Sequence, residues 1–489
     1  MSAAQLPAGT PTQLLIGGEW RDASSGSTIT VVNPATGAAL ASVADASVAD
    51  GAAALDAAVA AQESWAATPP RERGEILRRA WELTIARRDE LARIITLEMG
   101  KPLAESLGEV AYGAEFLRWF SEEAVRIDGR YTLSPDGRSR LLVLHRPVGP
   151  SLFITPWNFP LAMATRKIAP ALAAGCTSVL KPASQTPLTA LAFAAILLEA
   201  GVPAGVVNVI PTSQAGAVTG PLITDDRLRK LSFTGSTPTG KRLIRDSADQ
   251  VLRVSMELGG NAPFIVFEDA DVDAAVEGAL VAKLRNGGEA CVAANRMLVH
   301  ERVAEEFSRK LIARMAGYVQ GDGLDADVTI GPLIDEATRA KVSGLVDEAV
   351  SEGATIALGG AAPTDTAGYF YPPTVLTGVP QHARILSEEI FGPVAPIVTF
   401  ADESEAIRLA NASEYGLVAF AYTRDLNRAL RLAERLETGM FGLNTGLVSN
   451  PAAPFGGVKQ SGLGREGGAE GIGEFLETVY VGIADPLAS

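Results

Sequence analysis

Cysteine and histidine are scarce in this sequence, which has two cysteines and three histidines among 489 residues. Two cysteines cannot build a disulfide framework, so we expect a reducing compartment, the cytoplasm. His145, His300 and His382 lie far apart, outside the spacing of zinc ligands built from His and Cys. We therefore expect no metal site and interpret the histidines as surface or packing residues.

Long apolar runs and an excess of basic residues are also missing. The apolar stretch from Leu188 meets charged and turn residues before it reaches about 18 residues, the length that suggests a membrane-spanning helix. The start, "MSAAQLPAGTPTQ", lacks the basic and apolar regions of a secretory signal. The net charge of -15 disfavours nucleic-acid binding, which needs clustered Lys and Arg. We expect neither a membrane nor a nucleic acid as partner, which leaves small-molecule chemistry.

The pattern that is present is an alternation of strands and helices. A chain of this length predicts two large domains. Residues 51–127 have helical periodicity, and residues 151–258 alternate short apolar runs with helical segments, which predicts βαβ units and a parallel sheet. A second alternation runs from Pro263 to about Asn444 and places Cys291 in a loop near the junction of two α/β domains.

Two segments with strand composition lie outside both alternations. Residues 131–149 form a predicted hairpin around a Pro-Asp-Gly turn, and the other segment is the tail "EFLETVYVGIADPL". The predicted division is therefore residues 1–130 and 149–257 for the first domain, 258–465 for the second, and 131–148 with 466–489 for a small β arm.

Chemistry-bearing residues follow the predicted strands, where parallel sheets bind ligands. In "FTGSTPTG", Gly235 and Ser236 separate a strand from a helix start, which favours a phosphate site, although the segment is neither a G-x-G-x-x-G nor a P-loop motif. In "KPAS", Lys181 and Ser184 offer an ammonium and a hydroxyl to a ribose or its 2′-phosphate. In "LRNGGEACVAANR", two glycines let the backbone bring the Cys291 sulfur close to another molecule.

Seven motifs in order make the chain similar to the aldehyde dehydrogenase superfamily over nearly its whole length. They are "PWNFP", "KPAS", "FTGST", "MELGG", the segment around Cys291, "EEIFGP" and "PFGGVKQSGLGRE". The resemblance implies two Rossmann-like α/β domains with parallel sheets, the first binding the cofactor and the second catalytic, plus a β oligomerisation arm. The arm segments are then expected to pair across a subunit boundary, giving a homodimer or a homotetramer.

The resemblance also implies roles for individual residues. Cys291 is the nucleophile, the Asn158 amide and the Cys291 backbone N–H form the oxyanion hole, and Glu257 is the base for the hydrolytic water. Lys167 and Glu466 match positions linked to proton relay. Cys176, in "ALAAGCTSVL", better fits a small buried hydrophobe.

Glu389 is expected to bind the nicotinamide ribose, with Phe391 beside the ring. The expected cofactor contacts are Thr155, Pro156, Trp157, Lys181, Pro182, Ala183, Ser184, Phe233, Gly235, Ser236, Leu258, Glu389 and Phe391.

Within the superfamily, passages such as "TRKIAPALAAG" and "TIGPLIDE" are most similar to the succinate-semialdehyde dehydrogenases. A substrate with a distal carboxylate needs cationic side chains, and the resemblance assigns Arg166, Arg285, Ser449 and Phe455 to its pocket. A dehydrogenase for another semialdehyde, such as glutarate semialdehyde, and a noncatalytic structural descendant of the fold are the alternatives.

Two positions depart from the pattern of many members of this subfamily, which have Gln and a second Cys where this chain has Glu289 and Ala293. Without that second Cys, a local disulfide that blocks the nucleophile cannot form. The Glu289 carboxylate is expected to raise the thiol pKa of Cys291 by like-charge repulsion, unless it pairs with a neighbour.

Ser184 generates a prediction about the cofactor. Its hydroxyl does not repel a 2′-phosphate, so NADP is expected as the preferred cofactor and NAD as a possible one. Ser184→Glu should shift the ratio of kcat/KM values toward NAD by about tenfold, because a carboxylate repels the phosphate. Steady-state kinetics with both cofactors measures this, with Ser184→Ala as the uncharged control. A wild-type preference for NAD of about tenfold or more, unchanged by Ser184→Glu, would contradict the assignment.

Overall fold

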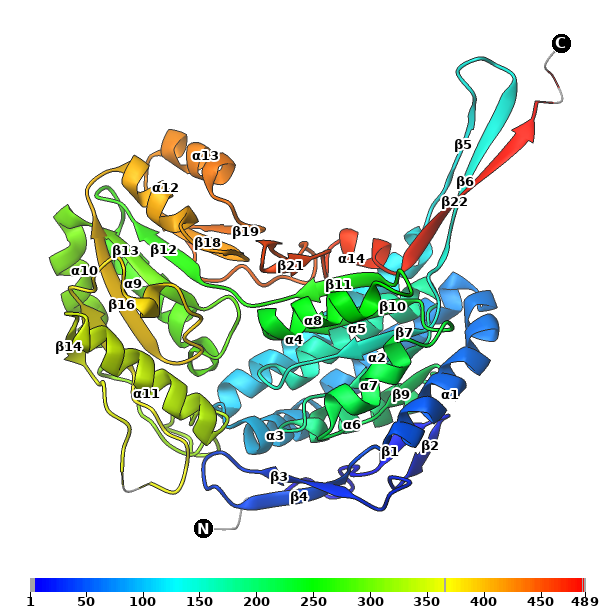
Figure 1. Cartoon of the computed structure of the whole chain (residues 1–489), viewed down its shortest axis with the longest axis horizontal. Coiled ribbons are helices and arrows are strands. Elements are labelled where there is room, and N and C mark those ends of the chain that lie inside the picture. The colour runs from blue at the N-terminus through cyan, green and yellow to red at the C-terminus, as the bar shows by residue number, and fades with distance from the viewer. Residues whose placement is uncertain (1–4, 365, 486, 488–489) are drawn as a thin grey trace.

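The computed structural model describes residues 5–364, 366–485 and 487, and consists of two α/β bodies with a narrow arm that projects from one of them (Figure 1). The first body is built on a sheet with the strand order β2-β1-β9-β8-β7-β10-β11-β21. Its strands are β1 (Leu14–Ile16), β2 (Glu19–Arg21), β7 (Ser151–Ile154), β8 (Ser178–Lys181), β9 (Val207–Val209), β10 (Lys230–Thr234), β11 (Arg253–Glu257) and β21 (Gly462–Leu463).

Five of these strands, β7 to β11, are parallel, and the chain order reverses between β7 and β10. That reversal is a topological switch point, where doubly wound sheets bind ligands at the carboxyl ends of the strands. The predicted segments "PWNFP" and "FTGSTPTG" follow β7 and β10 and therefore lie at this point.

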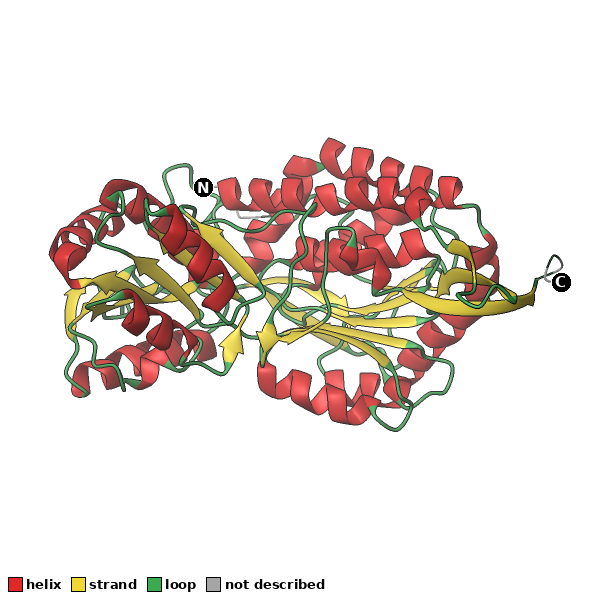
Figure 2. Cartoon of the chain, turned by 90° about the horizontal axis from the view of Figure 1, so that it is seen from above, coloured by secondary structure: helices red, strands yellow, loops and turns green. Residues whose placement is uncertain are grey.

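Helices cover both faces of the first sheet (Figure 2). They are α1 (Val48–Ala67), α2 (Pro70–Ala86), α3 (Arg88–Met99), α4 (Leu103–Glu123), the 3-10 turn η1 (Ala124–Arg126), α5 (Pro160–Ala174), α6 (Pro187–Glu199), α7 (Ala215–Ile223) and α8 (Thr237–Ser247). Every residue of α5 is buried, which explains its almost continuous apolar and small sequence. A β-hairpin of β3 (Thr28–Val32) and β4 (Ala39–Ala44) runs beneath this body.

The second body has a sheet with the order β14-β15-β16-β13-β12-β18-β19, parallel except for the β14–β15 pair. Its strands are β12 (Ala262–Val266), β13 (Ala294–His300), β14 (Thr355–Leu358), β15 (Thr374–Thr377), β16 (Val394–Phe400), β18 (Val418–Tyr422) and β19 (Met440–Leu443). Its helices are α9 (Val272–Leu284), η2 (Arg285–Gly288), α10 (Glu301–Met315), α11 (Glu336–Ser351), η3 (Arg384–Leu386), α12 (Glu403–Asn411) and α13 (Leu426–Arg435). Cys291 lies between η2 and β13, as the sequence predicted.

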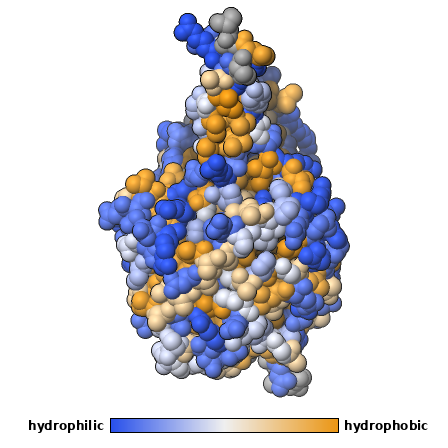
Figure 3. Space-filling model, turned by 90° about the vertical axis from the view of Figure 1, so that its right-hand side faces the viewer, coloured by the Kyte–Doolittle hydropathy of each residue, from blue (hydrophilic) through white to orange (hydrophobic). Residues whose placement is uncertain are grey.

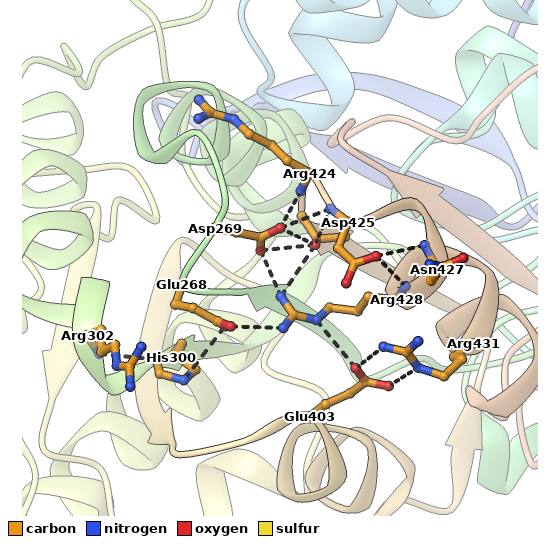
Figure 4. A network of polar contacts seen from close by, with 11 residues as sticks. Glu268, Asp269, His300, Arg302, Glu403, Arg424, Asp425, Asn427, Arg428 and Arg431 are labelled. Atoms are coloured by element: carbon orange, nitrogen blue, oxygen red, sulfur yellow. Dashed lines mark hydrogen bonds and ion pairs between the residues drawn. The ribbon is translucent and has the colours of Figure 1, made fainter.

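The second sheet also has a switch point, between β12 and β18, but protein side chains fill it (Figure 4). Arg428 of α13 donates to Asp269 at 2.8 Å and to Glu268 at 2.9 Å, both just after β12. Arg428 and Arg431 also pair with Glu403 at the start of α12. This ion-pair network ties α12 and α13 to the sheet and occupies the crevice where a doubly wound sheet would otherwise bind a ligand.

The chain returns to the first body before the predicted boundary at residue 465. A short pair of β17 (Tyr415–Gly416) with β20 (Val458–Lys459) precedes β21, which pairs with β11 of the first sheet. Gly462 permits this approach, because a Cβ at that position would lie 1.8 Å from the Met256 carbonyl oxygen. The small helix α14 (Glu470–Gly473) then packs against α5.

The arm is a three-stranded antiparallel sheet of β5 (Arg130–Leu133), β6 (Ser139–Pro147) and β22 (Leu476–Ala484), in the order β22-β6-β5. The predicted hairpin and tail therefore pair with each other within one chain, over nine residue pairs from Leu476↔Pro147 to Ala484↔Ser139. Any pairing with another subunit must use the outer edges of β5 and β22. Apolar side chains lie on the surface of the arm (Figure 3), and Tyr131, Leu133, Tyr480 and Ile483 are exposed there.

Over the described residues, none of the helices is long and apolar enough to cross a membrane. The same part of the chain contains no group of three or more His, Cys, Asp and Glu side chains that could hold a metal ion.

The arm generates a prediction about assembly. We expect light scattering at micromolar concentration to give the mass of a dimer or a tetramer, because exposed strand edges with apolar side chains favour association. The double variant Tyr480→Lys/Ile483→Lys should lower the mass toward that of a monomer by placing like charges on that surface. Leu426→Lys, at an equally exposed apolar position on α13, is the control and should keep the wild-type mass. A wild-type monomer would contradict the prediction.

Candidate active site

A cavity of about 260 Å³ opens between the two bodies, at the carboxyl edge of the first sheet. Fourteen of the residues singled out from the sequence line it: Pro156, Trp157, Asn158, Arg166, Gly235, Ser236, Glu257, Leu258, Arg285, Cys291, Glu389, Phe391, Ser449 and Phe455. The other eight do not line it: Thr155, Lys167, Lys181, Pro182, Ala183, Ser184, Phe233 and Glu466. The sequence did not single out Tyr112, Thr338 or Lys341, which also contribute to the cavity wall.

The loop that carries Cys291 has an unusual backbone. Asn286, Gly287 and Gly288 all have positive φ, at 58°, 63° and 79°. Gly288 has no room for a side chain, since a Cβ would lie 2.3 Å from the Gly392 carbonyl oxygen. Gly260 is similarly restricted by the Cys291 carbonyl oxygen, at 2.2 Å from a Cβ. These glycines let the loop turn tightly and bring Cys291 against the end of the first sheet.

Asn158 is tied to the same loop. It follows β7, and its side-chain amide Nδ2 donates to the Glu289 carbonyl oxygen at 3.0 Å. The Asn286 Nδ2 donates to that carbonyl at 2.9 Å and to the Asn158 carbonyl at 3.1 Å. The amide of Asn158 is therefore held beside Cys291 with one of its N–H bonds engaged, and the second remains for a ligand in the cavity.

Burial dominates the electrostatics of Cys291 and Glu257. It raises the thiol pKa of Cys291 to about 12; Arg166 acts in the opposite direction, while Glu389 and Glu257 add to the increase. It also raises the pKa of Glu257 well above its usual value, and one carboxylate oxygen of Glu257 has no hydrogen-bond partner among the described residues. At neutral pH the Cys291 thiol of the free site is therefore protonated, and the raised pKa makes Glu257 easier to protonate than an ordinary carboxylate.

Glu466 lies behind the cavity in a buried ion-pair cluster. Its two oxygens accept from Arg166 Nε and Lys167 Nζ. Burial alone would raise the pKa of Glu466, but the two cations hold it down at about 2, so the group is a carboxylate. The Arg166 guanidinium lies 4.0 Å over the Phe455 ring, and its Nη2 has no partner among the described residues. Arg166 thus faces the cavity with a charge that Glu466 already partly neutralises.

Arg285 presents a freer cation on the opposite wall. Its Nη1 donates to Ser449 Oγ at 3.4 Å, and its guanidinium stacks over Phe159 at 5.1 Å and Tyr112 at 5.8 Å. Over the described residues, Arg285 forms no salt bridge. The aromatic rings and the Ser449 hydroxyl hold the side chain in place while its charge remains available to an anion.

The residues expected to bind the cofactor surround the switch point of the first sheet. Gly235 lies between β10 and α8, where a Cβ would meet the Phe233 ring at 2.5 Å. Lys181, at the end of β8, is 7% exposed, and its ammonium has no hydrogen-bond or ion-pair partner among the described residues. Burial lowers its pKa to about 8. Ser184 is half-buried and donates to Gln185 Oε1 at 3.3 Å. A helix start and a buried ammonium, both at the carboxyl ends of strands of this sheet, fit a phosphate-bearing nucleotide.

At the other end of this surface, Glu389 Oε1 accepts from the Gly260 backbone N–H at 3.2 Å, and burial raises the pKa of Glu389 to about 7. Phe391 has a φ of 57° and meets the Trp157 ring edge-on at 5.4 Å. The two side chains frame the part of the cavity that opens toward Cys291.

The charged groups that shift the pKa of Cys291 are Arg166, Glu389 and Glu257, and Glu289, which was expected to raise it, is not among them. The Glu289 Oε1 accepts from the Ile334 backbone N–H at 3.0 Å, and burial raises the pKa of Glu289 well above the usual value. This hydrogen bond ties the loop that carries Cys291 to the segment around Ile334. Ala293 is buried and packs in a small apolar cluster with Phe159, Ala162 and Met163.

The sequence analysis also overlooked Lys101, Glu105 and Glu109, which contact Asn158, Asn286 and the start of α5 from behind the cavity. Their spacing of four residues in "KPLAESLGE" puts the charged groups on one face of a helix start. The same spacing of charged residues is common on solvated helix faces. Only burial in the folded structure distinguishes this cluster from such a face.

A doubly wound sheet whose ligand-binding edge faces a cavity with a cysteine, an amide donor and a buried carboxyl group fits a dinucleotide-linked oxidoreductase. The match to known proteins is more specific: residues 20–481 match the model of the aldehyde dehydrogenase family, and the chain belongs to that family.

Similar proteins include a succinate-semialdehyde dehydrogenase of Paenarthrobacter nicotinovorans, 63% identical over 91% of this chain and 99% of that protein. A glutarate-semialdehyde dehydrogenase of Pseudomonas putida is 50% identical over 96% of this chain and 98% of that protein. The crystal structure of an E. coli NADP-dependent enzyme has a TM-score of 0.96 at 51% identity, covering 97% of this chain and 98% of that one.

The protonated thiol generates a prediction. Iodoacetamide should label Cys291 alone, since Cys176 is fully buried. Between pH 8 and pH 9.5 the rate should rise about 30-fold, because the thiolate fraction grows throughout this range, whereas free cysteine gains about fourfold. Mass spectrometry measures the rate, and Cys291→Ser is the unlabelled control. A rate that levels off near pH 8.5 would contradict the raised pKa.

Proposed function

We propose that this chain oxidises succinate semialdehyde to succinate with NADP as the preferred cofactor and NAD as a possible one. The observation that carries the proposal is Arg285. It is a cation in the wall of a largely apolar cavity that also contains the Cys291 thiol, and it forms no ion pair with the described residues. A short aldehyde with a distal carboxylate uses both groups at once. The similarity to the Paenarthrobacter nicotinovorans protein supports the same substrate.

In the proposed mechanism the Cys291 thiol gives its proton to the ionised form of Glu257, the sulfur adds to the aldehyde carbon and forms a C–S bond, and the carbonyl oxygen becomes an alkoxide. The free N–H of the Asn158 amide and the Cys291 backbone N–H donate to this oxygen and stabilise its charge. NADP, when bound, supplies the hydride acceptor for this oxidation. The product on the protein is a thioester of Cys291.

Glu257 serves both proton transfers. Its raised pKa makes its ionised form a stronger base than an ordinary carboxylate, and its unpartnered oxygen is available to the thiol, whose proton it then passes to solvent, and to a water molecule in the cavity. As the base, it takes a proton from the water that attacks the thioester, and the C–S bond breaks to release succinate and the thiol. Glu466, held as a carboxylate by Arg166 and Lys167, stabilises the charges behind the site rather than exchanging protons at its low pKa.

The nucleotide site is proposed from Lys181 and Gly235. A buried ammonium without a partner among the described residues is costly unless a ligand supplies an anion, and Lys181 ends β8, two strands away from β10, which leads into α8. Ser184 adds a hydroxyl without a negative charge. The E. coli structure named as NADP-dependent supports the same preference.

Glutarate semialdehyde is the second candidate substrate, and the Pseudomonas putida relative supports it. Glutarate semialdehyde is one methylene longer than succinate semialdehyde, and such a difference changes the ratio of kcat/KM values by about 10- to 200-fold at most. A noncatalytic role is disfavoured, because Cys291, Glu257 and Asn158 all face the same cavity. We further propose a cytoplasmic location and assembly into a homodimer or homotetramer through the arm.

The substrate assignment is tested by NADPH absorbance with succinate semialdehyde, glutarate semialdehyde and propanal. Arg285→Ala should lower kcat/KM for succinate semialdehyde by about 10- to 150-fold, the value of one charge-assisted hydrogen bond, mainly through KM. Propanal lacks a distal carboxylate, so its kcat/KM should change by less than about threefold.

Arg424→Ala removes an exposed arginine from the second body and serves as the matched control, with wild-type kinetics expected. Equal losses with propanal and succinate semialdehyde in Arg285→Ala would assign Arg285 a structural role. Faster turnover of glutarate semialdehyde by the wild type would make that compound the substrate.

A further inference from the structure

Behind the cavity lies a buried cluster of charges that the proposed mechanism does not use. Lys101 precedes α4 and its side chain is 1% exposed; it forms an ion pair with Glu109, 0% exposed, at 2.6 Å. The Lys101 ammonium also lies 4.2 Å from the centre of the Phe159 ring. Burying a charged pair is costly, and most of that cost is not recovered as stability. Stability therefore does not explain why Lys101 and Glu109 are buried together, but their contacts with neighbouring residues do.

The Lys101 ammonium donates to the backbone carbonyl oxygen of Asn158 at 2.8 Å. The same carbonyl accepts from Asn286 Nδ2 at 3.1 Å, so two donors converge on the peptide group of the oxyanion-hole residue. A carbonyl held by an ammonium and an amide cannot rotate freely, and its fixed peptide plane sets the direction of the Asn158 side chain.

Glu109 fixes the segment that follows Asn158. Its Oε1 accepts from the backbone N–H groups of Leu161 and Ala162, at 2.9 and 3.2 Å, in the first turn of α5. The N-cap residue of α5, Phe159, makes no side-chain cap. Glu109 therefore caps a helix that begins two residues after Asn158, with the favourable sign of charge at a helix N-terminus.

Glu105, one turn before Glu109 on α4, holds the nucleophile loop. Its Oε2 accepts from the Asn286 backbone N–H at 2.8 Å. Asn286 is the first of the three residues with positive φ, and its side chain donates to the Glu289 carbonyl, which also accepts from the Asn158 amide. One charged face, formed by Lys101, Glu105 and Glu109, thus contacts both the Asn158 segment and the loop that carries Cys291.

We propose that Lys101 is a positioning residue, which, together with Glu109, orients the Asn158 amide toward the reacting carbonyl oxygen. This inference rests on the proposed function, since it acts through the role assigned to Asn158. Lys101 does not line the main cavity around Cys291 and is not assigned a contact with the substrate. Its effect is therefore expected in kcat, where oxyanion stabilisation acts, and not in the binding of NADP.

The test is a double-mutant cycle between Lys101 and Asn158. Lys101→Met/Glu109→Gln removes the charge pair together, so that no unpaired carboxylate is left buried, and the Gln oxygen can still accept from the start of α5. In this variant kcat should fall about 10- to 100-fold, with the Kd for NADP, measured by protein fluorescence, within about twofold of wild type. Asn158→Ala should lower kcat about 100- to 1000-fold. When Lys101→Met/Glu109→Gln is added to Asn158→Ala, kcat should fall by less than about a further threefold.

Lys230→Met is the matched control. Lys230 is also a fully buried lysine, paired with Glu474 and 5.0 Å from the Phe475 ring, but its contacts do not include the oxyanion hole. It should lose thermal stability and keep kcat within about twofold of wild type. Equal losses of kcat in Lys230→Met and Lys101→Met/Glu109→Gln would overturn the proposal, because they would show a general effect of buried lysines.

Two further results would also overturn the proposal: a wild-type kcat in Lys101→Met/Glu109→Gln, or losses that multiply with that of Asn158→Ala. The cycle can be run with propanal as well as with succinate semialdehyde. A failure of the proposed substrate would therefore appear in the wild-type kinetics, while the cycle with propanal would still decide the role of Lys101.

Discussion

Burial of ionisable groups where the two bodies meet is the constraint on which the rest of the site depends. The low dielectric raises the pKa of Cys291 and Glu257 and so favours the neutral forms of both groups next to the cavity. The same burial strengthens the electrostatic interaction of each fixed cation with nearby anions. Glu466 stays charged only because Arg166 and Lys167 contact it. The site thus separates groups that exchange protons from groups that hold a constant charge.

That separation requires a backbone that brings the two sheets within contact distance. Gly260 and Gly288 permit the close approach of the Cys291 loop to the first sheet and to Gly392. Residues Asn286 to Gly288 adopt a conformation that L-residues with side chains rarely take, and contacts from Glu105 and Glu289 maintain it. The nucleophile is therefore positioned by backbone contacts from both bodies and not by its own helix or strand.

The two sheets show how similar topology can serve different purposes. Both have a switch point, but in the first sheet it faces the cavity, and the buried Lys181 ammonium beside it has no partner among the described residues. In the second sheet, Arg428 and its acidic partners fill the corresponding crevice. The second body instead contributes Cys291 from the amino end of β13, so that catalytic and cofactor-binding surfaces face each other across one cavity.

The sequence by itself determined the family, the two alternations of strands and helices, and the segments that follow each strand, because periodicity and local motifs are properties of neighbouring residues. It also located the hairpin and tail of the arm. Only the tertiary structure decided that these two segments pair within one chain, that Glu289 is buried and accepts a hydrogen bond from the Ile334 backbone, and that Arg166 forms an ion pair with Glu466. It alone revealed Lys101 and Glu109, since their pattern resembles a solvated helix face until the fold buries it. Contacts between residues far apart in the chain determine which ionisable side chains are buried and which are paired. Burial and pairing then determine the pKa of each group.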